Sequence, residues 1–172
     1  DGKSITLVYV DGTQGWKITD NADQTTELPA FITATGGTIT NSPCGNYKIH
    51  TFTGPGTFTV CSVGNPAGSD SVDYLVVAGG GGGGGGHGGG GGAGGYRESS
   101  GASSGCYSTS PLGACVSALP VTAQGYPITV GSGGTAGGGY LHSVPSKGGN
   151  GNNSVFSTIT STAGGGAGGY NV

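Results

Sequence analysis

The side chains able to do acid–base, nucleophilic or metal chemistry are few and widely spaced along this chain. Its three histidines are His50, His87 and His142, without the i, i+4 or HExxH spacing of a helical metal site. His50 alternates within a strand-like run and is expected on a sheet surface, because a metal site needs several convergent ligands. The acids after residue 30 are Asp70, Asp73 and Glu98, which form neither a paired-carboxylate site nor a Ser–His–Asp arrangement. We therefore expect no enzyme activity, no catalytic residue, no metal and no cofactor.

The four cysteines, Cys44, Cys61, Cys106 and Cys115, have spacings unlike a zinc knuckle or a CxxC redox motif. Two disulfides in an extracellular setting are expected, and free buried thiols are the alternative. A Cys106–Cys115 bridge would close a short polar loop. A Cys44–Cys61 bridge would need the chain to fold back at 43–45, because a straight strand leaves the two about 13 Å apart and bridging requires Cα atoms within about 7 Å.

The residues from Gly79 to Gly95 are all glycine except His87 and Ala93. Such a tract matches the dinucleotide pattern G-x-G-x-x-G trivially, and no helix or correctly placed acid follows it. One interpretation is a flexible linker. The other is ordered glycine, in which threefold polyglycine II helices pack side by side and supply one another's hydrogen-bond partners.

The glycine runs recur in a fixed context, which favours the ordered interpretation. GGGAGGY occurs at 90–96 and again at 164–170, and AGGGY occurs at 136–140. Each run follows a strand-like segment, at 74–77, 155–159 and 126–130 respectively. Unstructured low-complexity sequence would not tie each run to a strand.

Several polar or aromatic residues interrupt or follow the glycine runs. His87 is interpreted either as a side chain at an exposed corner or as a contact residue at a tip. The tyrosines either cover the ends of the packed glycine layer or, with Arg97, contact a glycan or protein. The candidate contact residues are His87, Tyr96, Arg97, Tyr107, Tyr140 and His142.

Composition limits the conventional core and the classes of partner. Glycine supplies 43 of the 172 residues and hydrophobic residues only 33%, while the net charge is −3. Nucleic-acid binding is therefore not expected, and no apolar run approaches the roughly 20 residues that span a bilayer. Because methionine is absent, we expect this chain to be a fragment or processed piece of a longer polypeptide.

The remaining pattern predicts an all-β fold in three parts. Residues 1–19 are expected to end an upstream β unit with a hairpin, 20–40 to form a linker and first strand, and 41–172 to form the glycine-rich domain. That domain is expected to be a small antiparallel, jelly-roll-like β-sandwich with glycine runs inserted as polyglycine II helices.

Four local predictions concern how the strands of this domain pair. Residues 47–60 are predicted to form a hairpin around Gly54-Pro55, and 72–77 a central strand buried on both faces. Residues 121–130 are predicted to form a strand with Pro127 at an edge, and 153–160 a single last strand.

Several segments together resemble a known family of phage domains. They are KIHTFTGPGTFTV, VDYLVVAGGGGGGG, the stretch from GGAGGYRESSG to PITVGSGG, and GNNSVFSTITSTAGGGAGG. Over residues 34–172 they resemble the glycine-rich domain of tail-fibre and other virion-surface proteins of marine tailed bacteriophages. DYLVVAGGGG is also similar, more weakly, to the extracellular glycine-rich region of anaplastic lymphoma kinase receptors, where strands of a sandwich run into bundled polyglycine helices.

The phage resemblance implies a structural protein on the virion surface, outside the cell, with host recognition at loop tips through a surface glycan or protein. It also implies a homotrimer, with contacts expected at the hairpin around Trp16, and other virion proteins as partners of an upstream region. A capsid decoration or knob protein is one alternative, and a bacterial surface adhesin or extracellular filament subunit is another.

Overall fold

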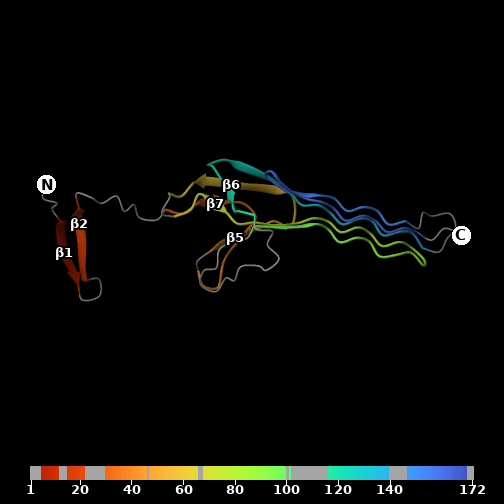
Figure 1. The fold of residues 1–172 in the computed structure, drawn as a ribbon, viewed down its shortest axis with the longest axis horizontal. Coiled ribbons are helices and arrows are strands. Elements are labelled where there is room, and N and C mark those ends of the chain that lie inside the picture. The colour runs from red at the N-terminus through yellow and green to blue at the C-terminus, as the bar shows by residue number, and fades with distance from the viewer. Residues whose placement is uncertain are drawn as a thin grey trace.

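The computed structural model describes residues 5–11, 15–21, 30–45, 47–65, 68–99, 101, 116–139 and 147–169. These residues form strands, turns and extended segments without a helix, which confirms the predicted all-β class (Figure 1). In chain order the strands are β1 (Ile5–Asp11), β2 (Gly15–Asn21), β3 (Thr33–Thr35), β4 (Thr38–Asn41), β5 (Lys48–Thr51), β6 (Gly56–Ser62), β7 (Ser71–Val72), β8 (Leu75–Val77), β9 (Tyr96–Glu98), β10 (Leu119–Pro120), β11 (Gly125–Thr129), β12 (Ser154–Phe156) and β13 (Ile159–Ser161).

The largest sheet carries a small aromatic core. Its five strands run in the order β13-β12-β11-β6-β3 with antiparallel neighbours, an arrangement compatible with the expected sandwich. The rings of Phe58, Tyr126 and Phe156 pack with centroids 6.0 to 6.5 Å apart, within the range of favourable aromatic pairs. The Thr122 N–H donates to the Tyr126 hydroxyl over 2.7 Å, and hydrogen bonding with the Thr122 side chain lowers the Tyr126 pKa from its ordinary value. The other buried members of this core are Val60, Val76 and Val121.

The predicted hairpin over 47–60 is wrong. β5 pairs with β4, whereas β6 pairs with β3 and β11, so the two expected arms belong to different sheets. Their shared partner is the chain at 33–41, which bends between β3 and β4 at Gly36 and Gly37, both with positive φ (106° and 64°). The extra residues around Gly54-Pro55 bulge out opposite this bend. A different local turn thus pairs β5 with β4, while β6 takes the more distant partners β3 and β11.

The chain does reverse close to the predicted place, but the reversal joins β4 to β5. The Ser42 N–H donates to the Tyr47 carbonyl over 2.9 Å, and the Gly45 N–H donates to the Ser42 carbonyl over 2.8 Å. Gly45 has a φ of 70°, which glycine adopts without steric cost.

The predicted Cys44–Cys61 disulfide is not formed. Cys61 is an exposed free thiol in β6, whereas Cys44 is disulfide-bonded and therefore has a partner other than Cys61. The proposed bridge depended on the hairpin that the structure replaces. Cys106 and Cys115 lie outside the described residues. Because the chain has four cysteines and Cys61 is free, the bond that Cys44 makes is incompatible with the predicted Cys106–Cys115 pairing.

The stretch 72–77 is not a buried central strand. It divides into β7, which pairs with β10, and β8, which pairs with β9. Only Val76 of β8 faces the core, while Leu75 and Val77 are 59% and 52% exposed. The apolar run reflects an apolar outer face, which sequence alone does not distinguish from two-sided burial.

One further strand prediction is wrong, and another is confirmed in part. Residues 153–160 form the β12–β13 hairpin, turning at Ser157 with a φ of 53°, instead of one strand. β11 lies inside the five-stranded sheet, but its ladder to β12 begins only at Ile128. Pro127 pairs with β6 alone at that level, so it lies at a local edge of the sheet as predicted and does not interrupt a two-sided ladder.

The N-terminal hairpin is confirmed. β1 and β2 pair antiparallel, and the Tyr9 and Trp16 rings meet edge to face with centroids 5.3 Å apart. Trp16 is nevertheless 68% exposed.

Candidate functional site

Five glycine-rich segments leave the sheets and run side by side (Figure 1). We call them together the polyglycine bundle. The central segment is 78–85, and the return segment is 89–95, which comes back antiparallel to it. The other three are residues 131–139, 147–152 and 162–169. β8, β11 and β13 lead directly into the central segment and into 131–139 and 162–169, which places each run after a strand as predicted.

Hydrogen bonds repeat every third residue along the central segment. The N–H groups of Ala78, Gly81 and Gly84 donate to the return segment over 2.8 to 2.9 Å, and those of Gly79 and Gly82 donate to 147–152 over 2.8 to 3.0 Å. A polyglycine II helix has three residues per turn and makes no internal hydrogen bonds, so each row of groups points at one neighbour. The observed spacing is that of polyglycine II packing.

The carbonyl groups of the central segment follow the same rule. Those of Gly79 and Gly82 accept from 162–169, and those of Gly80 and Gly83 accept from 131–139, over 2.8 to 2.9 Å. Burial in 162–169 has the same period, because Ser161, Gly164 and Ala167 are buried while the residues that follow each of them are exposed. The glycine runs are therefore ordered by backbone partners and are not a flexible linker.

Glycine is needed in the bundle for close approach rather than for unusual dihedral angles. None of the described glycines in the five segments has a positive φ; Gly86, with a φ of 62°, lies in the turn that joins two of them. A Cβ at Gly82 would collide with the Thr135 carbonyl, and one at Gly85 with the Gly138 carbonyl. At Gly165 and Gly168 a Cβ would meet nothing within 4 Å. The requirement for glycine thus varies from position to position along each segment.

His87 lies at the turn that joins the central and return segments. The Gly84 N–H donates to the Gly89 carbonyl over 2.9 Å, and the Gly88 N–H donates to the Gly85 carbonyl over 3.0 Å. His87 is exposed there, at the end of this pair of segments away from the sheets. The position fits both interpretations from the sequence, because an exposed corner is also a tip.

Tyr96 and Arg97 lie at the other end of the return segment, in β9. The Tyr96 hydroxyl donates to Glu98 Oε2 over 2.7 Å, and β9 pairs with β8. Nine residue steps at a rise of about 3.1 Å place His87 about 28 Å from Tyr96. The structure therefore divides the candidate contact residues between two ends of the bundle. Tyr107, Tyr140 and His142 lie outside the described residues.

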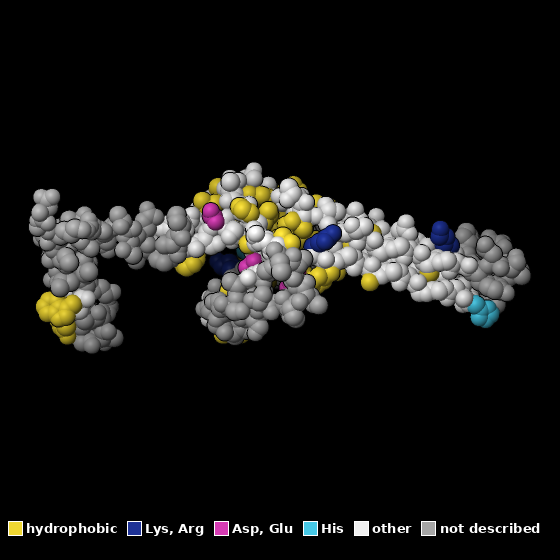
Figure 2. Space-filling view, viewed as in Figure 1, with side chains coloured by type: hydrophobic (Ala, Val, Ile, Leu, Met, Phe, Trp, Pro, Cys, Tyr) yellow, Lys and Arg dark blue, Asp and Glu magenta, His cyan; other side chains and the backbone are white. Residues whose placement is uncertain are grey.

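The surface of the bundle carries few hydrophobic or charged side chains. Figure 2 shows hydrophobic side chains gathered over the sheets, while the glycine segments present mainly backbone. Within the described part of the chain, no three His, Cys, Asp or Glu side chains come together as a metal site would require. The same residues contain no helix long and apolar enough to cross a membrane.

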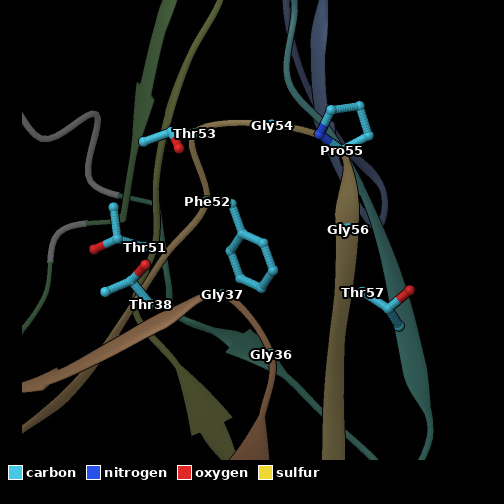
Figure 3. Close-up of a pocket in the computed structure, with 10 residues that line it drawn as sticks. All are labelled: Gly36, Gly37, Thr38, Thr51, Phe52, Thr53, Gly54, Pro55, Gly56 and Thr57. Atoms are coloured by element: carbon cyan, nitrogen blue, oxygen red, sulfur yellow. The ribbon is translucent and has the colours of Figure 1, made fainter.

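A shallow cleft of about 380 Å³ lies where the chain bulges between β5 and β6. The half-buried Phe52 ring points into it, beside Gly36, Gly37 and Gly56 (Figure 3). The other lining residues are threonines, Gly54 and Pro55, so none of the described residues that line the cleft is charged. It can offer an apolar ring, hydroxyl groups and backbone, but no acid–base or metal chemistry. Sequence reasoning missed this cleft, because Phe52 was assigned to a hairpin strand.

Sequence reasoning also missed the fifth segment of the bundle, 147–152. Its signal is the short run Gly148-Gly149-Asn150-Gly151, which carries no tyrosine and follows no strand-like segment. The Gly148 and Gly151 N–H groups donate to 162–169, and the Gly149 and Asn152 N–H groups donate to 131–139.

Comparisons with curated proteins and with solved structures find no match to this chain. Comparison with protein families finds one described as a glycine-rich domain, matched over residues 51–172. The matched range contains the whole polyglycine bundle and most strands of the five-stranded sheet. The chain therefore belongs to the glycine-rich domain family.

Proposed function

We propose that this protein is a structural component of the virion surface of a tailed bacteriophage, of the tail-fibre kind. The observation that carries the proposal is the construction of the bundle. Its segments are joined by backbone hydrogen bonds at three-residue intervals and leave the β core in one direction. Such a bundle forms an extended projection without needing a large hydrophobic core.

The composition of the projection suits an extracellular surface. After residue 78 the only charged residues are Arg97, Glu98 and Lys147, so the extended part is nearly neutral and depends little on pH or salt. The sequence resemblance to virion-surface proteins of marine phages supports the choice of a virion.

Immunogold labelling of intact virions with antibodies to the purified chain tests this assignment. Label on the tail fibres is expected. Label confined to the capsid would favour the decoration protein, and label on uninfected bacterial cells would favour the adhesin. Either result would overturn the tail-fibre assignment.

The proposal includes contact with the host through the distal turn. Among the described residues, His87 is exposed at the turn itself and Lys147 at the start of 147–152, whereas Arg97 is exposed at the base. Exposed polar side chains on loops held by a rigid scaffold often carry binding. The expected ligand is a glycan or protein of the host surface.

Binding of the labelled chain to host cells tests this contact, with His87→Ala compared against Arg97→Ala as the matched control. We expect His87→Ala to weaken cell binding about tenfold, the loss of roughly one contact hot spot, and Arg97→Ala to leave it unchanged. The reverse ranking would move the contact to the base of the bundle.

A further inference from the structure

One side of the central segment carries hydrogen-bonding groups that no other part of the described chain uses. Within the described chain, the N–H groups of Gly80 and Gly83 donate to no partner, and the carbonyls of Gly81 and Gly84 accept from none. Both rows repeat every third residue, as do the filled rows. These glycines are half-buried, unlike the fully buried Gly79 and Gly82.

The order of the neighbouring segments explains the open side. The return segment bonds to 162–169, which bonds to 147–152, which bonds to 131–139, and all four bond to the central segment. No bond joins the return segment to 131–139 in the described chain. The four neighbours therefore surround the central segment on all sides but one. We call this side the open face; it lies between 89–95 and 131–139, with Gly80 and Gly83 in its middle.

The N–H donors that point outward from segment 162–169 do have acceptors. The Gly166 N–H donates to Asn150 Oδ1 and the Ala163 N–H donates to Asn153 Oδ1, each over 2.8 Å. Asparagine side chains thus supply acceptors where 162–169 lacks a neighbouring segment. No side chain of the described residues does this for Gly80 or Gly83.

The partner that fits the open face must have the same backbone period. At a rise of about 3.1 Å, donors three residues apart stand about 9 Å apart along the segment, which a threefold helix matches and a β-strand does not. Its residues must also lack side chains where the backbones touch, as the bundle's own segments do. The stretch 78–95 has no Lys, Arg, Asp or Glu, so the fit selects for a neutral partner.

We propose that the open face docks the polyglycine bundle of a second copy of this chain. A second copy presents the same rows of donors and acceptors, so groups unfilled in one copy can be filled by the other. The inference goes beyond the proposed function, and it involves a different surface from the hairpin around Trp16.

Self-association of the full chain tests the proposal, measured by sedimentation velocity over a concentration series. The test variant is Gly80→Ala with Gly83→Ala. Its new Cβ atoms would lie 3.5 Å and 3.8 Å from their nearest neighbours, an ordinary contact, so the bundle is retained while methyl groups occupy the open face. The matched control is Gly165→Ala with Gly168→Ala, where a Cβ meets nothing within 4 Å in a segment away from the open face.

We expect the test variant to raise the dissociation constant for self-association at least about tenfold, while the control stays within about twofold of the unmodified chain. Amide exchange gives a second measurement. The Gly80 and Gly83 amides should exchange fast in the dilute monomer and slowly in the associated form.

Three results would overturn the proposal. They are an unmodified chain that stays monomeric at up to about 100 µM, a test variant that associates as strongly as the unmodified chain, and equal weakening by test and control. The second result would be seen if Trp16→Ala abolished association and the test variant did not. It would support the contact through the hairpin and reject docking through the open face.

Discussion

At the scale of single residues, the glycines of the bundle differ in what they do. Those packed against another backbone exclude any side chain, as Gly82 does against the Thr135 carbonyl. Those facing solvent, such as Gly165, have room for a methyl group. Because these glycines do not adopt positive φ, the space around Cβ rather than the backbone conformation decides which substitutions are tolerated.

This difference predicts opposite effects for two chemically identical substitutions. Gly82→Ala should destabilise the protein by about 3 kcal/mol, because a packed segment must move. Gly165→Ala should be neutral or stabilising by about 0.5 kcal/mol, because alanine restricts the unfolded chain and fits the folded one. Urea unfolding of both variants measures the difference, and equal losses would contradict the packing described.

The state of the cysteines gives a second prediction at this scale. In the native, unreduced protein, iodoacetamide should modify Cys61, which is exposed and free, and should leave Cys44 unmodified, because it is disulfide-bonded. Peptide mass spectrometry before and after reduction reports both residues. Modification of Cys44 without reductant would contradict the structure.

At the scale of elements, the five glycine segments replace side-chain packing with backbone hydrogen bonds. The central segment bonds to all four other segments and so acts as the axis of the bundle. Only Ala78, His87 and Ala93 interrupt glycine between residues 78 and 95, so cohesion here depends on the pairing of N–H and carbonyl groups.

Amide exchange should therefore show protection in a glycine tract. The N–H groups of Gly79, Gly81 and Gly82, each bonded to a neighbouring segment, should exchange at least about 100-fold more slowly than in an unfolded chain. Gly89 and Gly90 serve as controls, because their N–H groups make no bond within the described chain. Random-coil rates at all five positions would exclude the packed bundle.

At the scale of the whole molecule, the small core leaves large apolar side chains at the surface. Trp16 and Phe31 are each 68% exposed, and Leu75 and Val77 form an apolar outer face on β8. Thin cores are commonly completed by association or by disulfides. The homotrimer expected from the phage resemblance would bury the hairpin around Trp16.

Light scattering of the chain should give a trimer mass. Trp16→Ala should shift the mass toward the monomer, because it removes the largest exposed ring of the hairpin. Phe31→Ala, with the same exposed fraction elsewhere in the chain, is the matched control. A monomer mass at micromolar concentration, or equal effects of both substitutions, would count against the trimer.

Local sequence determined the all-β class, the N-terminal hairpin and the order of the glycine runs. Alternating apolar residues and turn residues act within a few positions of each other, so their consequences can be predicted from the chain alone. The recurrence of strand followed by glycine run likewise predicted ordered polyglycine II packing, and it identified the tract that contains His87.

Only the tertiary structure decided which segments became partners. β5 and β6 are consecutive and strand-like, yet β5 pairs with β4 across the turn at 42–47, and β6 pairs with the more distant β3 and β11. Three other features also depend on which segments pair in the folded chain. They are the disulfide of Cys44, the outer face of β8 and the role of 147–152. The open face beside Gly80 is decided in the same way, since an unfilled hydrogen-bond row exists only once its neighbours are in place.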